Sequence, residues 1–191
     1  MRGLIQGKHL YLRGLVESDA SGPYPTWLND REINAGNSHG AFPYATSAAL
    51  DYIRQSQTRR DALILAIVLN EGDRHIGNIS LQAIHPVYRS AELALLIGER
   101  DCWGKGYGRE AASLICRHGF ETLNLHRIHC GTFAHNNGMQ SIAKALGMRQ
   151  EGVRRQAAYK DGHYVDVIEY GLLRDELRPW PDTSTHLESA P

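Results

Sequence analysis

The sequence predicts one α/β domain built on a mixed sheet, in which antiparallel and parallel strands lie side by side. The chain has 191 residues, enough for one domain with a full core. Three consecutive strand-like runs indicate an antiparallel meander. A strand, helix and strand in series follow them, which is typical of a parallel pair. The expected element order is β-α-α-β-β-β-α-β-α-β-β.

The first third of the chain predicts one strand and two helices. Residues 8–15 form the strand, and residues 17–33 a short helix capped by Ser18 or Asp19. A glycine and two prolines should interrupt this helix: Gly22, Pro23 and Pro25. A loop over 34–46 leads to an amphipathic helix over 47–60, capped by Thr46 or Ser47.

The meander is predicted over residues 62–98. Residues 62–69 are continuously apolar, which indicates a strand buried on both faces. Residues 72–86 alternate, with Ile79 and Leu81 facing one way and Asn78 and Ser80 the other. The third strand spans 90–98.

The second half predicts a helix over 108–124, a strand over 127–133 and a helix over 137–148 that Gly147 ends. Two strands within 149–173 should be joined at Asp161-Gly162, a strong hairpin signal. Residues 1–177 are therefore expected to form a single domain. The polar, proline-bearing residues 178–191 are expected to be a disordered tail.

Composition limits the function. Lys plus Arg and Asp plus Glu number 21 each, so no nucleic-acid footprint is indicated. No run of 18 apolar residues predicts a membrane span, and the N-terminus is too polar for a secretory signal. The three scattered cysteines, Cys102, Cys116 and Cys130, fit a cytoplasmic protein without disulfides.

A metal site is not expected. The tightest histidine group is His126, His129 and His135, and on a strand the first two would point to opposite faces. No zinc-binding spacing is present either.

The glycine-rich turn "WGKGYGRE" (103–110) stands between the third meander strand and a helix. Its spacing is wrong for the dinucleotide-binding fingerprint, and Lys105 is misplaced for a phosphate-binding P-loop. Bare amides at a helix start form an anion site suited to a diphosphate. The alternative interpretation is a tight β-to-α turn without a ligand.

Four segments in order carry a resemblance to a known family. They are "YLRGLVESDA…WLNDREI", "AELALLIGERDCWGKGYGREA", "HNNGMQSIAKALGMRQEG" and "YKDGHYVDVIEYGLL". Together they resemble the GCN5-related N-acetyltransferases, in the branch that acetylates ribosomal-protein N-termini. The resemblance covers roughly residues 8–173, although Trp103 replaces the usual Gln or Arg. It implies a sheet flanked by helices and split between its fourth and fifth strands.

The resemblance implies that acetyl-coenzyme A lies in this split as co-substrate. A bulge in the fourth strand would free amides at Leu96, Ile97 and Gly98 for the pantetheine arm. The pyrophosphate would lie on the turn, whose residues are Trp103, Gly104, Lys105, Gly106, Tyr107, Gly108 and Arg109. Asn136 would reach the pantetheine or the helix start. Lys144 would contact the adenosine phosphates, or else be a solvated lysine.

The chemistry requires a base, because an alkyl amine with a pKa of about 10 is protonated at neutral pH. The resemblance places Glu92 on the acceptor side, and Ala94 and Leu96 on its face would raise its pKa. The alternative is a glutamate paired with Arg89.

Many relatives carry a tyrosine that protonates the departing thiolate, whereas Ala143 stands there and Met139 replaces the usual serine. Ser141, a water, Tyr159 or Tyr164 could serve instead, or no acid is needed. An acyl-cysteine route through Cys102 or Cys130 is disfavoured.

The acceptor is expected to be a primary amine, either a protein N-terminus or a small molecule. Trp27, Asn34, Phe42 and Tyr44 are candidate wall residues, with ordinary core packing as the alternative for each. A homodimer is common in the family but unmarked here. The competing functions are a non-catalytic acetyl-coenzyme A sensor or partner-binding module, and a nucleotide-binding dehydrogenase that the glycine spacing disfavours.

Overall fold

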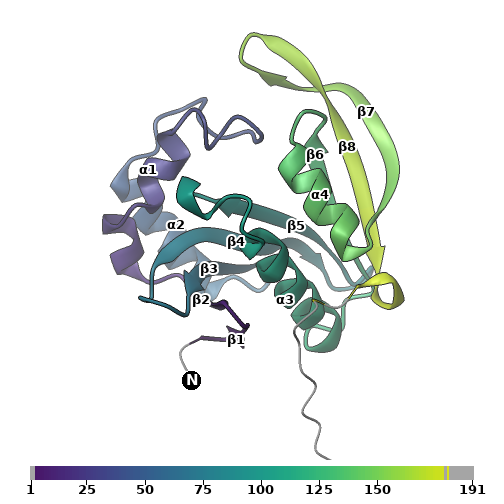
Figure 1. The fold of residues 1–191 in the computed structure, drawn as a ribbon, viewed down its shortest axis with the longest axis horizontal. Helices are drawn as coiled ribbons and strands as arrows, with labels where there is room; N and C mark the ends of the chain where they lie inside the picture. The colour runs from purple at the N-terminus through teal and green to yellow at the C-terminus, as the bar shows by residue number, and fades with distance from the viewer. Residues whose placement is uncertain (1–2, 179, 181–191) are drawn as a thin grey trace, which may run out of the picture.

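The computed structural model of the chain describes residues 3–178 and residue 180. Within them, one eight-stranded sheet has the order β1-β2-β3-β4-β5-β6-β8-β7 (Figure 1). The strands are β1 (Ile5–Gln6), β2 (Leu10–Gly14), β3 (Leu63–Leu69), β4 (His75–His85), β5 (Ser90–Ile97), β6 (Arg127–Phe133), β7 (Arg149–Lys160) and β8 (His163–Leu173). Strands β5 and β6 pair in parallel and the other neighbours are antiparallel. The predicted mixed sheet is confirmed.

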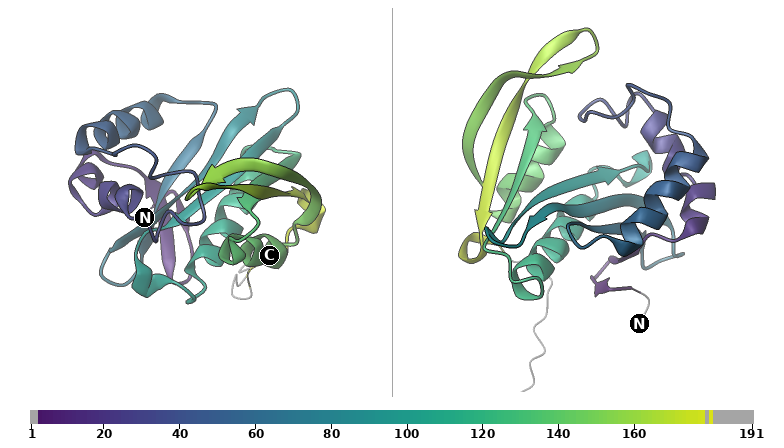
Figure 2. Two further views of the ribbon diagram at one scale, coloured as in Figure 1. Left: turned by 90° about the horizontal axis from the view of Figure 1, so that it is seen from above. Right: turned by 180° about the vertical axis from the view of Figure 1, so that it is seen from behind.

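Helices cover both faces of the sheet, as Figure 2 shows from two further sides. They are α1 (Tyr24–Asn29), α2 (Thr46–Thr58), α3 (Tyr107–Glu121) and α4 (Asn137–Leu146). The predicted helix order is confirmed, but strand β1 was not expected. The expected cap of α2 is wrong: Ala45 precedes the helix without a side-chain cap, and Thr46 is its first residue.

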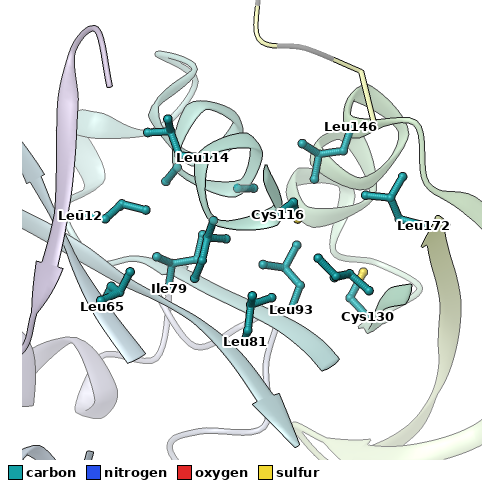
Figure 3. Packing of buried hydrophobic residues seen from close by; sticks show 14 of the residues in the cluster. Leu12, Leu65, Ile79, Leu81, Leu93, Leu114, Cys116, Cys130, Leu146 and Leu172 are labelled. Carbon is teal, nitrogen blue, oxygen red and sulfur yellow. The ribbon is translucent and has the colours of Figure 1, made fainter. Parts of the chain in front are cut away.

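Two hydrophobic clusters hold the layers together. The larger one packs α3 and α4 on one face of the central strands, and Figure 3 shows Leu114 and Cys116 of α3 above Ile79, Leu81 and Leu93. The smaller cluster packs α1 and α2 against the opposite face of β2 and β3. Strand β3 is buried on both faces, as its continuous apolar run predicts.

The sheet splits between β5 and β6, the fourth and fifth strands expected from the sequence. Their parallel register runs only from Ser90↔Arg127 to Glu92↔His129. Beyond Glu92, β5 continues to Ile97 and β6 to Phe133 without pairing with each other. The resemblance therefore predicted the position of the split correctly.

The β7–β8 hairpin forms an arm that leans toward the loop between α1 and α2 (Figure 1). Three residues of β7 lie between Arg154 and Ala158 opposite the single residue Asp166, whose Oδ1 accepts from the amide of Gln156 at 2.8 Å. Such an insertion bends a strand. The arm's tip is then tied to the loop, because Lys160 Nζ donates to the carbonyl of His39 at 2.9 Å.

Asp19 is the buried carboxylate that joins β2 to the start of the helical layer. Its side chain is 7% exposed and accepts from Arg13 at 2.8 Å through both oxygens and from the amide of Val16 at 2.9 Å. Burial alone would raise the pKa of Asp19, but the hydrogen bonds from Arg13 and His75 outweigh it. The pKa is therefore held well below its usual value.

We expect Asp19→Asn to destabilise the fold by about 3 kcal/mol at pH 7, because it leaves Arg13 beside an uncharged partner. The folded-state pKa of Asp19 lies below its unfolded value of about 3.9, so this contribution is complete above that pH. It is lost as the pH falls from about 4 toward the folded-state pKa. Urea unfolding at pH 7 and pH 3 should show the difference between wild type and variant shrinking. A difference independent of pH, or equal to that of the exposed Glu71→Gln, would contradict this account.

Candidate active site

The glycine-rich turn (103–110) leads from β5 into α3, and its glycines leave the backbone amides uncovered by side chains. Gly104 has a φ of +71° and Gly106, which precedes the first helical residue, a φ of +86°. Both angles lie in the left-handed region that favours glycine. The first amide of α3 to donate a helical hydrogen bond is that of Glu110, which donates to the carbonyl of Gly106 at 3.0 Å. The amides of Tyr107, Gly108 and Arg109 precede it and remain at the positive end of the helix.

These amides open onto a cavity of about 580 Å³, which we call the glycine-loop cavity. Its walls are the turn, the end of β5, the start of α4 and part of the loop after α1. Of the expected cofactor residues it is lined by Leu96, Ile97, Trp103, Gly104, Gly106, Tyr107, Gly108, Arg109 and Asn136. The lining does not include Gly98, Lys105 or Lys144. A helix start, left-handed glycines and an open cavity together suit a diphosphate.

The free edge of β5 differs in detail from the expectation. The amide of Gly98 donates to the carbonyl of Ile76 at 2.9 Å, so the expectation of a free amide at Gly98 is wrong. Since amides alternate along a strand, the amide of Leu96 also points toward β4, whereas those of Leu95 and Ile97 point into the split. Leu95 was not predicted. The register shift lies between Gln82 and His85 on β4, at the far end from the expected bulge.

Gly98 has a different role from the expected one. A Cβ on it would lie 2.0 Å from the ring of Trp27, which is 2% exposed and donates through Nε1 to Glu99 Oε1 at 3.0 Å. The glycine therefore makes room for the indole. Trp27 accordingly lies under the end of β5 and lines neither cavity.

A second cavity of about 560 Å³ lies over the face of β4 and β5 that α1 and α2 partly cover; we call it the strand-face cavity. Glu92, Ala94 and Leu96 of β5 line it, as strand alternation predicted. No ion pair joins Glu92 to Arg89 in the described part of the chain, so the alternative pairing is not seen. Glu92 is also the only carboxylate among the described residues that line this cavity.

The two cavities meet at the split. Six residues line both: Gly36, Asn37, Leu95, Leu96, Asn136 and Met139. They come from the loop after α1, from β5 and from the start of α4, so the shared wall lies where β5 and β6 separate. A molecule in the glycine-loop cavity can therefore reach one in the strand-face cavity through the sheet.

The expected acceptor residues are mostly elsewhere. Of the four, only Tyr44 lines the strand-face cavity. Asn34 is 1% exposed and donates to the carbonyl of Trp27 at 3.0 Å, which makes it a core residue. Phe42 is 84% exposed and lines neither cavity. The core-packing alternative was correct for Trp27 and Asn34.

Helix α4 borders both cavities at its start. Asn136 caps it, since its Oδ1 accepts from the amide of Met139 at 3.0 Å, and its Nδ2 donates to the carbonyl of Gly36 at 2.9 Å. The helix-start alternative for Asn136 is thus confirmed. Ser141 lines the glycine-loop cavity, whereas Ala143 is fully buried in the core. Lys144 is exposed on the outer side.

The remaining chemically reactive candidates do not converge on the split. Tyr159 and Tyr164 pack against each other on the hairpin arm, 63% and 65% exposed, and line neither cavity. Burial raises the pKa of Cys102 and that of Cys116, and it raises the pKa of Cys130 to about 12. These thiols therefore stay protonated, which leaves an acyl-cysteine route without a nucleophile.

Trp180 lies over the outer side of the glycine turn. The guanidinium carbon of Arg109 is 5.2 Å from the centroid of its ring, and a Cβ on Gly106 would lie 3.4 Å from the ring. Arg178 donates from its amide to the carbonyl of Leu146 at 2.9 Å. These two residues belong to the expected tail but pack on the domain; residues 179 and 181–191 lie outside the described residues.

The described residues, 3–178 and 180, contain no group of three or more His, Cys, Asp or Glu side chains arranged to hold a metal ion. None of the helices in this part of the chain is both long and apolar enough to cross a membrane.

Known proteins resemble this chain over most of its length. The family model of the acetyltransferase (GNAT) domain matches residues 9–149. The uncharacterized N-acetyltransferase YoaA of Bacillus subtilis is 26% identical over 90% of this chain and 97% of its own length. The uncharacterized N-acetyltransferase p20 of Bacillus licheniformis is 31% identical over 58% of this chain and 62% of its own length. The spermidine N-acetyltransferase of Vibrio cholerae, solved with CoA and spermine, has a TM-score of 0.80 at 21% identity, covering 89% of this chain and 98% of that one.

Proposed function

Because the chain belongs to the acetyltransferase (GNAT) family and is an acetyl-coenzyme A-dependent N-acetyltransferase, we propose that it transfers the acetyl group directly to one primary amine. The amine is held in the strand-face cavity and the coenzyme in the glycine-loop cavity. The observation that carries the proposal is the wall of six residues that the two cavities share at the split.

Backbone amides bind the coenzyme at two places, its pyrophosphate and its pantetheine arm. The amides at the start of α3 hold the pyrophosphate, with Gly104 and Gly106 letting the chain approach it without a Cβ clash. The pantetheine arm follows the free edge of β5, where the amides of Leu95 and Ile97 point into the split. This direction brings the thioester to the shared wall.

Glu92 is the proposed base. The amine must lose a proton before its nitrogen attacks the thioester carbon, and Glu92 is the carboxylate of the strand-face cavity. The new C–N bond forms as the C–S bond breaks, and the coenzyme leaves as a thiolate. The proton that the ammonium group loses passes to Glu92, directly or through a water, and then to solvent. The second proton, released from the nitrogen once the C–N bond has formed, goes to the thiolate or to solvent. The protein thereby supplies orientation and proton transfer, while the coenzyme supplies the activated acetyl group.

The proposal is tested in two steps. Calorimetry with acetyl-coenzyme A should show binding, and thiol release should follow when an amine is added from a set of small amines and peptides. An absence of heat at millimolar acetyl-coenzyme A would remove the proposed coenzyme site. Tight binding with no thiol release across the whole set would favour the non-catalytic module instead.

Ser141 is the remaining side-chain candidate for the acid that protonates the departing thiolate. Ala143 is buried and has no acidic group, and both hairpin tyrosines lie outside the cavities. A thiol with a pKa of about 8.5 leaves tolerably as its anion near neutral pH. We therefore expect Ser141→Ala to lower kcat by about 10-fold or less. Steady-state thiol release measures this. A loss as large as that of a base variant would make Ser141 essential.

Three finer expectations from the sequence stay predictions: a protein N-terminus as the natural acceptor, a homodimer and a cytoplasmic location. Size-exclusion chromatography with light scattering measures the second directly. Thiol release with the peptides of the amine set tests whether a protein N-terminus is the acceptor.

A further inference from the structure

The strand-face cavity has two chemically different ends. At one end Glu92 of β5, which pairs with His129 of β6, lines the cavity together with Gly131, which has no side chain. At the other end three tyrosines, Tyr24, Tyr44 and Tyr52, gather with the apolar side chains of Leu28 and Ile64. Burial raises the pKa of Tyr24 and that of Tyr52, so both hydroxyls stay uncharged at neutral pH.

Asn78 lies on the floor between the two ends, and its amide is fixed in one orientation. The ring Nε2 of His75 is 2.9 Å from the carbonyl of Gly77, which accepts only, so this nitrogen carries the proton. The same Nε2 is 2.9 Å from the side chain of Asn78, which must therefore present its oxygen. The Nδ2 amide group is left for the cavity that Asn78 lines.

Asp19 and Trp27 hold the ring of His75 in its orientation. Its Nδ1 lies 3.4 Å from Asp19 Oδ1, and Asp19 is held by Arg13 through both oxygens. The ring of Trp27 packs against that of His75 with centroids 5.0 Å apart. The donor of Asn78 is thus aimed at the cavity by a chain of buried contacts, which is how polar groups are fixed in binding sites.

The charges of the cavity limit what it can hold. Glu92 is the only carboxylate among its described lining residues, and they include no lysine or arginine. A second ammonium group at the tyrosine end would find no carboxylate among the described lining residues and only tyrosine rings and hydroxyls as partners, so its desolvation is costly. A neutral ring would instead pack on the tyrosines, and an oxygen on it would accept from Asn78.

The spacing fits such a molecule. Glu92 pairs with Gln82, and Asn78 pairs with Leu96, so the two side chains are separated by the stretch of β4 from Gln82 to Asn78. Four residues of strand span about 13 Å. Part of that distance is covered by the glutamate side chain or a bridging water. The rest accommodates an amine joined by a short linker to one ring.

From these observations we propose that the acceptor is a monoamine carrying a neutral, ring-bearing group with a hydrogen-bond acceptor, and that polyamines are excluded. The tyrosine end and Asn78 select the ring, and Glu92 receives the amine. The inference rests on the proposed function, because it assigns the second half of the same acceptor site. Free arylalkylamines and peptides with an N-terminal tyrosine share this chemistry.

The test compares acetylation rates of four probes: tyramine, spermidine, a tripeptide beginning with tyrosine and the same tripeptide beginning with lysine. We expect kcat/KM for each aromatic probe to exceed that for its cationic counterpart by at least about 10-fold. The two aromatic arms also distinguish a small-molecule acceptor from a protein N-terminus. Preference for the cationic probe in both arms would overturn the inference.

Asn78→Asp is the sharpest variant, since it keeps the oxygen that faces His75 and replaces the donor by a carboxylate oxygen. We expect it to lower kcat/KM for tyramine by at least about 10-fold and to raise that for spermidine. An unchanged ranking in a variant that melts like the wild type would overturn the inference. Should the variant fail to fold, Tyr52→Leu serves instead, with the exposed Tyr88→Leu as its matched control.

The outcomes distinguish a failure of the proposed coenzyme site from a failure of the proposed acceptor site. If acetyl-coenzyme A does not bind, the proposed coenzyme site fails before any acceptor matters. If it binds and a polyamine is the best substrate, the proposed function stands and the two-ended acceptor site is wrong.

Discussion

Gly108→Val is expected to weaken acetyl-coenzyme A binding at least about 100-fold, or about 2.7 kcal/mol, while the domain stays folded. Gly108 lines the glycine-loop cavity from the first turn of α3. A Cβ there would lie 3.0 Å from Ile142 Cδ1 and 3.3 Å from Leu95 Cδ2. A side chain would thus stand between α3, α4 and the free edge of β5, where the pantetheine arm has to pass.

Helix formation cannot explain this glycine. Gly108 does not have a positive φ, and glycine inside a helix costs about 0.5–1 kcal/mol relative to alanine. A larger residue would therefore favour the helix by itself. What the glycine provides is close packing of α3 against the side chains of Ile142 and Leu95, beside the amides that hold the diphosphate. We expect Gly108→Ala to have an intermediate effect, because the tip of Ile142 can shift.

Calorimetry with acetyl-coenzyme A and thermal melting measure the two properties separately. The matched control is Gly14→Val on β2, where a Cβ would meet nothing within 4 Å. If Gly108→Val bound the coenzyme like the wild type, the glycine-loop cavity would not be the coenzyme site. If it melted far below the control, the assay would move to Gly108→Ala.

Local sequence patterns were sufficient to predict most of the fold. The continuous apolar run of β3, the alternation of β4 and the Asp161-Gly162 turn each follow from interactions between near neighbours in the chain. The helix cap was missed because Ala45 offers no side-chain signal: the start of α2 is set by packing of Ala49 and Ile53 on the sheet.

The acceptor side could not be predicted in the same way, because its residues meet only in three dimensions. The sequence predicts Trp27 as a wall residue, whereas its indole fills the space left by Gly98, a residue separated from it by most of the N-terminal half. Conversely, strand alternation correctly placed Asn78 on the face opposite Ile79 and Leu81, but its role depends on His75 and Asp19 behind it. No short motif records such an arrangement.

Glu92→Gln is expected to lower kcat by at least about 100-fold while acetyl-coenzyme A binding stays within a factor of about two, because a proton acceptor is lost without a change of shape. Glu92 lines the strand-face cavity and is absent from the lining of the glycine-loop cavity, so the coenzyme should not sense the substitution. The exposed Glu121→Gln at the end of α3 is the control for a neutralised carboxylate. Full turnover in Glu92→Gln would reject the assignment.

The pH dependence distinguishes a base from a residue that only shapes the cavity. An amine with a pKa of about 10 becomes unprotonated in solution as the pH rises, and it then needs no base in the enzyme. The rate of Glu92→Gln should therefore climb toward that of the wild type between about pH 7 and pH 10. A weakly basic amine, already unprotonated at neutral pH, should show a much smaller loss. A deficit that stayed constant across pH and across both amines would mean that Glu92 positions the acceptor without taking its proton.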